Sequence, residues 1–172
     1  DQNAFELAVD TILHAKHIYI IGIRSCAPLA SFMAFYFTLM FPNVHLIQTS
    51  SSSEIFEQMV RIGKEDVIIG ISFPRYSMRT LKAMEFANNR SAKVITLTDS
   101  VHSPMNLYSS CNLIADSDMA SIVDSLVAPL SVINALIVAL CMKKQNEVAK
   151  TLEMLEDIWD EYQVYENDEI NY

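Results

Sequence analysis

The chain has 172 residues, of which 51% are hydrophobic, and a formal net charge of −9. This length suits one domain with a sizeable core, and the hydrophobic content excludes an intrinsically disordered chain. Most of the negative charge lies in residues 145–172, which contain nine acidic side chains and one basic side chain. The rest of the chain is nearly neutral and has no basic stripe, so we do not expect it to bind nucleic acid unaided.

The cysteines Cys26, Cys111 and Cys141 lie far apart without CxxC spacing, and no secretory leader is recognisable. We therefore expect reduced thiols and a cytoplasmic protein. The uncharged stretches 25–53 and 125–142 raise the alternative of membrane-spanning helices, but prolines interrupt or bound both stretches. Helices buried on a sheet or in a subunit interface are the favoured interpretation.

Short apolar runs alternate with helix-patterned segments along most of the chain. Residues 3–14 place apolar side chains near helical spacing, which predicts an amphipathic opening helix within residues 1–14. Five runs dominated by Ile, Val and Leu are predicted strands: 17–23, 44–48, 66–73, 93–98 and 111–115. The other predicted helices lie between and after these strands: 27–41, 53–63, 78–90, 104–109, 120–143 and 145–162.

The predicted strands are continuously apolar, which is typical of a parallel sheet covered on both faces. Regular β-α alternation predicts an α/β fold with one doubly wound, five-stranded parallel sheet and helices on both faces. We see no domain boundary, so residues 1–172 are expected to form a single domain that ends in an acidic helix and tail, 145–172. Apolar side chains follow one side of 147–165, which predicts packing on its own domain, with binding to a partner as the alternative.

Polar residues follow the first and third predicted strands, at the points where these strands end. Hydroxyl groups, a thiol and guanidinium groups form the candidate ligand-binding set: Arg24, Ser25, Cys26, Ser72, Arg75 and Ser77. Each loop opens a predicted helix, so free backbone N–H groups gather there as well. The carboxyl ends of parallel strands are where α/β proteins bind phosphorylated ligands.

Several of these residues also have a simpler interpretation. Ser77 is suited to cap the helix that follows it, but capping accounts for neither Ser72 nor Arg75. The alternative for Arg75 is a solvated surface arginine, and for Cys26 a redox sensor at a helix N-terminus. Ser51 and Glu54 have the spacing of a capping box, within a serine run of which one or two hydroxyls could face a ligand.

The chain lacks the motifs of common cofactor sites. Its only glycines are Gly22, Gly63 and Gly70, so neither a dinucleotide fingerprint nor a Walker loop can be assembled. No His, Cys or carboxylate pair has metal-ligand spacing, so we expect no cofactor and no metal. His102 lies in a predicted turn without a recognisable acidic or nucleophilic partner, so it is interpreted as a turn residue rather than a general base.

The order and spacing of these strand-loop-helix units resemble a SIS (sugar isomerase) domain. The loop 72–77 and the sequence after it resemble the sensor half of RpiR-type transcriptional regulators, and the resemblance spans about 15–165. It implies a flavodoxin-like three-layer sandwich that binds a phosphorylated sugar effector. It also implies contact with DNA only through a helix-turn-helix domain absent from this chain. The nearly uncharged helices 27–41 and 122–142 exceed what a five-stranded sheet of this size should cover, so we expect a homo-oligomer, a dimer or dimer of dimers.

Both loops depart from the family pattern. The second usually reads Ser-x-Ser-Gly-x-Ser/Thr, but here Pro74 and Arg75 replace the middle Ser and Gly. The first usually reads Gly-x-Gly-x-Ser, but here Arg24 stands at the second Gly and Cys26 at the Ser. We expect Arg75 to compensate by a bidentate contact with the anion. Either Ser25 replaces the contact of the usual serine, or the ligand differs from an ordinary hexose phosphate.

The later helices lack the groups expected of an enzyme. Sugar-phosphate isomerases need a base to move a proton between adjacent carbons, and members of the SIS family draw such groups partly from their later helices. Residues 117–144 contain no Glu and no His, and their only acids are Asp118 and Asp124. This absence favours an effector-sensing domain that binds a phosphorylated sugar without turnover and has no catalytic residues. The alternative is a small sugar-phosphate aldose-ketose isomerase.

Overall fold

Five parallel strands lie at the centre of the structure, a computed structural model that describes residues 1–49, 51–117 and 125–165. The strands are β1 (Ile18–Gly22), β2 (Val44–Ile47), β3 (Val67–Ile71), β4 (Lys93–Thr98) and β5 (Cys111–Ile114). They pair in the order β2-β1-β3-β4-β5, and every pairing is parallel. The predicted doubly wound parallel sheet is therefore confirmed.

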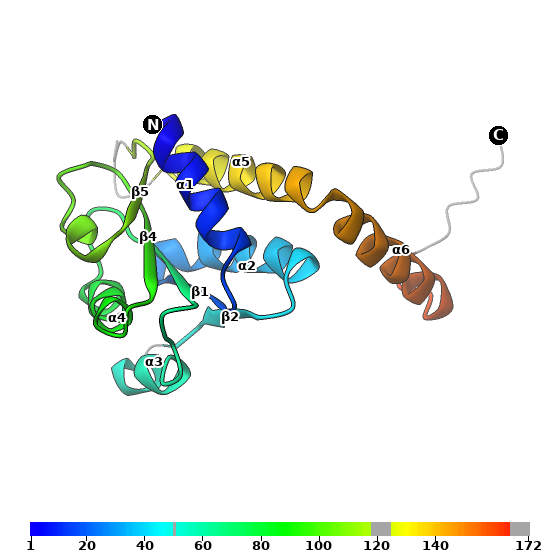
Figure 1. Ribbon diagram of the computed structural model, residues 1–172, viewed down its shortest axis with the longest axis horizontal. Helices are drawn as coiled ribbons and strands as arrows, with labels where there is room; N and C mark the ends of the chain where they lie inside the picture. Colours follow the sequence, from blue (N-terminus) through cyan, green and yellow to red (C-terminus); the bar gives the residue numbers. More distant parts are fainter. Residues whose placement is uncertain (50, 118–124, 166–172) are drawn as a thin grey trace.

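Helices cover both faces of this sheet (Figure 1). On one face lie α1 (Gln2–Leu13), α2 (Ala27–Met40) and α5 (Val127–Lys143). On the other face lie α3 (Ser52–Gln58), α4 (Met78–Asn89) and the 3-10 helix η2 (Pro104–Tyr108). A second 3-10 helix, η1 (Arg24–Cys26), connects β1 to α2, and α6 (Gln145–Glu161) follows α5.

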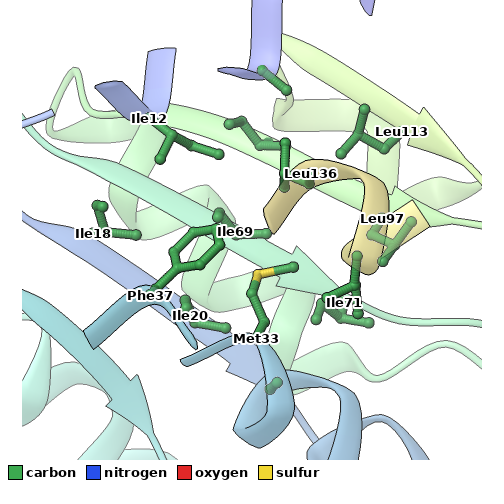
Figure 2. Close-up of a cluster of buried hydrophobic side chains, with 14 of the residues drawn as sticks. Ile12, Ile18, Ile20, Met33, Phe37, Ile69, Ile71, Leu97, Leu113 and Leu136 are labelled. Carbon is green, nitrogen blue, oxygen red and sulfur yellow. The ribbon is translucent and has the colours of Figure 1, made fainter. Parts of the chain in front are cut away.

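The larger of two hydrophobic clusters lies between the sheet and α1, α2 and α5. Ile20 and Ile69 of the strands meet Phe37 of α2 and Leu136 of α5 there, as Figure 2 shows. All four side chains are fully buried, and burying a side chain of this kind contributes about 1.5–3 kcal/mol. A smaller cluster forms on the opposite face, which explains why β1 and β3 are apolar at every position.

The segment around α3 differs from the prediction in two ways. The helix predicted for 53–63 ends at Gln58, after which i→i+3 hydrogen bonds form a turn. Ser51 is the N-cap by position, but its side chain makes no capping hydrogen bond, so the predicted capping box is wrong. Thr49 instead connects Ser51 to Glu54, because its hydroxyl donates to the Glu54 carboxylate and accepts from the Ser51 N–H at 3.0 Å.

Most of α6 extends away from the rest of the domain (Figure 1). α6 is bent by 98° relative to α5. Val148 packs partly against the larger cluster, but no residue of α6 is buried, and Leu152 and Ile158 are exposed. The prediction that this helix packs on its own domain is therefore correct for its first turn and wrong for the remainder. The predicted helix 120–143 is α5 from Val127 onward, and residues 118–124 lie outside the described residues.

Within the described part of the chain, no single helix has both the length and the apolarity needed to cross a membrane. The sharply bent pair of α5 and α6 meets these criteria, by length and composition alone, when the two helices are taken together.

Gly22 sets how closely the end of β1 approaches η1, and this contact is open to test. A Cβ atom at Gly22 would lie 2.5 Å from the Cys26 carbonyl oxygen. We expect Gly22→Ala to displace η1 and to lower the free energy of unfolding by about 1–3 kcal/mol in urea titrations. Gly63→Ala is the matched control, because nothing lies within 4 Å of a Cβ atom there. Equal destabilisation by both variants would show that the close approach is unimportant.

Candidate anion-binding cleft

The carboxyl ends of β1 and β3 border a cleft of about 600 Å³. These strands are neighbours in the sheet although β2 lies between them in the sequence, and Gly22 pairs with Ile71 at their ends. The loops after both strands therefore border the same cleft. All the predicted binding residues line it: Arg24, Ser25, Cys26, Ser72, Arg75 and Ser77. Such a position, where the strand order reverses, is typical of ligand sites in doubly wound sheets.

Two serine hydroxyls occupy the β3 side of the cleft. Ser72 is only 3% exposed, and its Oγ accepts a hydrogen bond from the Ser77 N–H at 2.9 Å. The Ser77 Oγ in turn accepts from the Thr80 N–H at 3.3 Å and so caps α4. Because each oxygen already accepts a backbone N–H, each hydroxyl proton can be directed at a ligand. The N-terminus of α4 adds its partial positive charge at the same place.

Tyr76 ties the second loop to the end of β4. Its hydroxyl donates to the Asp99 carboxylate, with distances of 2.9 Å to Oδ1 and 3.2 Å to Oδ2. Asp99 also accepts from the Thr98 hydroxyl at 3.1 Å. Burial raises the pKa of Tyr76, a hydrogen bond with Ser103 lowers it, and Asp99 raises it again. The net shift is upward, so the phenol stays protonated and keeps donating.

The first loop carries an unusual backbone conformation at Arg24. Its φ of 59° lies in the left-handed region, which favours glycine because other residues meet steric strain there. Ser25 is exposed at the cleft, whereas Cys26 is only 5% exposed and packs in the larger hydrophobic cluster. Ser25 is therefore the better placed of the two to contact a ligand, and the burial of Cys26 does not favour a redox sensor.

The side chains that line the cleft are positively charged overall. Of the residues that the structure describes, the lining includes Arg24, Arg75 and Arg79 and no Asp, Glu or His. Arg79 was not among the predicted residues, although it lies in the first turn of α4, where a cation is unfavourable unless an anion is near. That position was the signal that could have identified it. Tyr76 was also missed, because its partner Asp99 lies 23 residues away in the sequence.

Other candidates lie elsewhere in the fold. The serine run 51–53 does not line the cleft, and His102 is exposed in a turn, as predicted. Across the ranges that the structure describes, no group of three His, Cys, Asp or Glu side chains could hold a metal ion. The chemistry available in the cleft is therefore that of hydroxyl, guanidinium and backbone N–H donors, which suits an anionic ligand.

The fold and the cleft together define a class of protein: a doubly wound α/β domain with a cleft at the carboxyl ends of its strands that is lined by hydroxyl and guanidinium groups. The family can also be named. Residues 11–139 match the SIS domain model, which is most of the chain, so the protein belongs to the SIS domain family. The resemblance deduced from the two loops and their spacing is confirmed.

Among curated proteins, the chain is 27% identical over 164 residues to an uncharacterised HTH-type transcriptional regulator from Caldanaerobacter subterraneus. The match covers 91% of this chain and 57% of that regulator, so the chain spans little more than half of its relative's length.

Solved structures show the same fold. The sugar isomerase domain of an RpiR transcription factor from Sphaerobacter thermophilus superposes with a TM-score of 0.86 at 23% identity, covering 91% of this chain and 87% of that one. The Vibrio vulnificus NanR protein complexed with ManNAc-6P superposes with a TM-score of 0.81 at 16% identity, covering 97% and 63%. Other similar structures are described as putative phosphosugar isomerases, so the fold alone does not separate sensors from enzymes.

The hydrogen bond from Tyr76 to Asp99 is expected to order the second loop. Tyr76→Phe keeps the ring and removes this bond, so we expect the free energy of unfolding to fall by about 1–2 kcal/mol. Amide hydrogen exchange in residues 73–77 should also become faster. Tyr36→Phe, at an exposed position on α2, is the control and should change neither quantity. Unaltered exchange in Tyr76→Phe would contradict the positioning role.

Proposed function

We propose that this chain is the effector-sensing domain of a transcriptional regulator and binds a phosphorylated sugar in the cleft without turnover. The observation that carries the proposal is that the Ser72 and Ser77 hydroxyls lie together at the N-terminus of α4, linked by the hydrogen bond from the Ser77 N–H to the Ser72 Oγ. Arg75 lies between them in the loop. Two hydroxyl donors, a helix terminus and a guanidinium group match the oxygens and the charge of a phosphate. Family membership supports the sugar, and the HTH-type relative supports the regulatory role.

Among the residues that the structure describes, none that lines the cleft is a carboxylate or an imidazole, which favours binding over catalysis. Moving a proton between carbon atoms requires a base within hydrogen-bond reach, most often an imidazole or a carboxylate. The Asp99 carboxylate is not among the residues that line the cleft, and it accepts hydrogen bonds from Tyr76 and Thr98. An aldose-ketose isomerase of the same fold is the alternative, and formation of a ketose from an aldose phosphate would establish it.

Removing the two hydroxyls tests the site. We expect Ser72→Ala with Ser77→Ala to weaken binding of a sugar phosphate by about 2–4 kcal/mol in titration calorimetry, because two charge-assisted hydrogen bonds are lost. The control pair Ser52→Ala with Ser53→Ala removes two exposed hydroxyls outside the cleft and should leave affinity unchanged. The same titrations, followed by NMR for product, detect any ketose. Unchanged affinity in the cleft variant would move the site elsewhere.

Ser77→Asp separates binding from helix capping. Aspartate is as good an N-cap as serine, so α4 should remain stable. Its negative charge would stand beside the ligand phosphate, and we expect binding to be lost while thermal unfolding without ligand stays near that of the wild type. A variant that unfolds earlier but still binds would show that Ser77 serves only the helix.

We further propose that the chain forms a symmetric homo-oligomer, a dimer or dimer of dimers, in a regulator whose DNA-binding helix-turn-helix domain lies outside this sequence. Large apolar side chains are exposed on the neighbouring helices α2 and α5: Phe35, Val138 and Met142. Their exposure, and that of the apolar side of α6, supports an interface. We expect light scattering at micromolar concentration to give at least twice the monomer mass. A monomer would contradict the proposal.

A further inference from the structure

Two arginines reach the cleft from different strands. Arg24 follows β1 and Arg75 follows β3, and both side chains are exposed at the cleft. In the described ranges 1–49, 51–117 and 125–165, neither guanidinium forms an ion pair with a carboxylate. Both charges are therefore available to a ligand that enters between the two loops.

The charge and the hydrogen bonds of one phosphate group can be satisfied without Arg24. A phosphate monoester carries a charge of about −1.5 to −2 near neutral pH. The N-terminus of α4 supplies about half a positive charge, and Arg75, in the loop that leads into α4, supplies a full one. The hydroxyls of Ser72 and Ser77 complete the hydrogen bonds. Arg79, in the first turn of α4, also lines the cleft on the side of this phosphate site. Arg24, on the opposite loop, adds a further positive charge, and the described residues that line the cleft include no carboxylate.

The backbone at Arg24 indicates independently that this position is special. Its φ of 59° would be free of strain for glycine, whereas a side chain there costs stability. Strained residues of this kind are held in place by the surrounding structure and cluster at ligand sites. A guanidinium placed at the cleft by such a backbone is well positioned to recognise an anion.

We propose that the effector carries two anionic groups, a phosphate held by Ser72, Ser77 and Arg75 and a second anion held by Arg24. The ligand class is then phosphorylated sugar acids or sugar bisphosphates rather than monophosphates of sugars that carry no other charge. This inference rests on the proposed function, because it assumes that the cleft binds a phosphorylated sugar.

Matched ligand pairs test the second anion. Sorbitol 6-phosphate and 6-phosphogluconate are both open chains and differ at one carbon, which is an alcohol in the first and a carboxylate in the second. Fructose 6-phosphate and fructose 1,6-bisphosphate differ by one phosphate. In titration calorimetry at fixed salt, we expect the member with two anionic groups in at least one pair to bind at least about tenfold more tightly, as one charge-assisted contact provides. The pair that shows the preference identifies the second group as carboxylate or phosphate.

Variants assign the preference to Arg24. Arg24→Gln should abolish the discrimination within a pair and weaken the monophosphates less than Arg75→Gln does, because only Arg75 contacts the shared phosphate. Arg24→Gly is the folding control, because glycine adopts a φ of 59° without strain. It should be at least as stable as the wild type and also lose the discrimination.

The failures of the two proposals are distinguishable. If neither inorganic phosphate nor any of the four esters binds the wild-type chain at millimolar concentration, the proposed function is wrong. If the monophosphates bind as tightly as the ligands with a second anionic group, only the second anion is overturned. The same conclusion follows if Arg24→Gln weakens monophosphates as much as Arg75→Gln does, because both arginines would then hold one phosphate.

Discussion

The pairing of β1 with β3 is the constraint on which the rest of the site depends. The chain passes from β1 through α2 to β2 at the sheet edge, and returns to place β3 on the other side of β1. Register at the end of this pair sets Gly22 beside Ile71, so the loops that follow emerge at the same level. The covered faces on either side hold the two strands in this register, because slippage would move buried side chains out of their clusters.

The hydrogen bonds that fold the second loop also prepare it for an anion. The Ser72 hydroxyl accepts from the backbone of Ser77, which in turn caps α4, while Tyr76 fixes the same loop to Asp99. Donors held in this way require little further ordering when a ligand arrives, so less of the interaction energy is lost to entropy.

Arg24 and Arg75 add two guanidinium groups to the cleft of this SIS domain. Both stand where the family's loops usually have glycine, whose role there is to let the backbone itself approach the ligand. In the proposed binding mode, guanidinium groups would replace some of that close approach with longer, forked hydrogen bonds and with charge. At Arg24 the left-handed backbone typical of glycine is kept although the side chain is not glycine. The geometry of the first loop therefore survives a change in its chemistry.

The sequence by itself determined the parallel sheet and the cleft residues on the loops after β1 and β3. Both depend on local signals: uninterrupted Ile and Val runs, and hydroxyls or arginines at strand ends where helices begin. The tertiary structure decided the bond between Tyr76 and Asp99, the place of Arg79 beside the cleft, and the direction of α6. The amphipathic pattern of α6 shows which side is apolar, but the bend after α5 decides whether that side meets the domain. The periodicity of apolar residues shows which side of a helix or strand is apolar. Which other element packs against that side depends on the angles between elements, and these depend on packing across the whole chain.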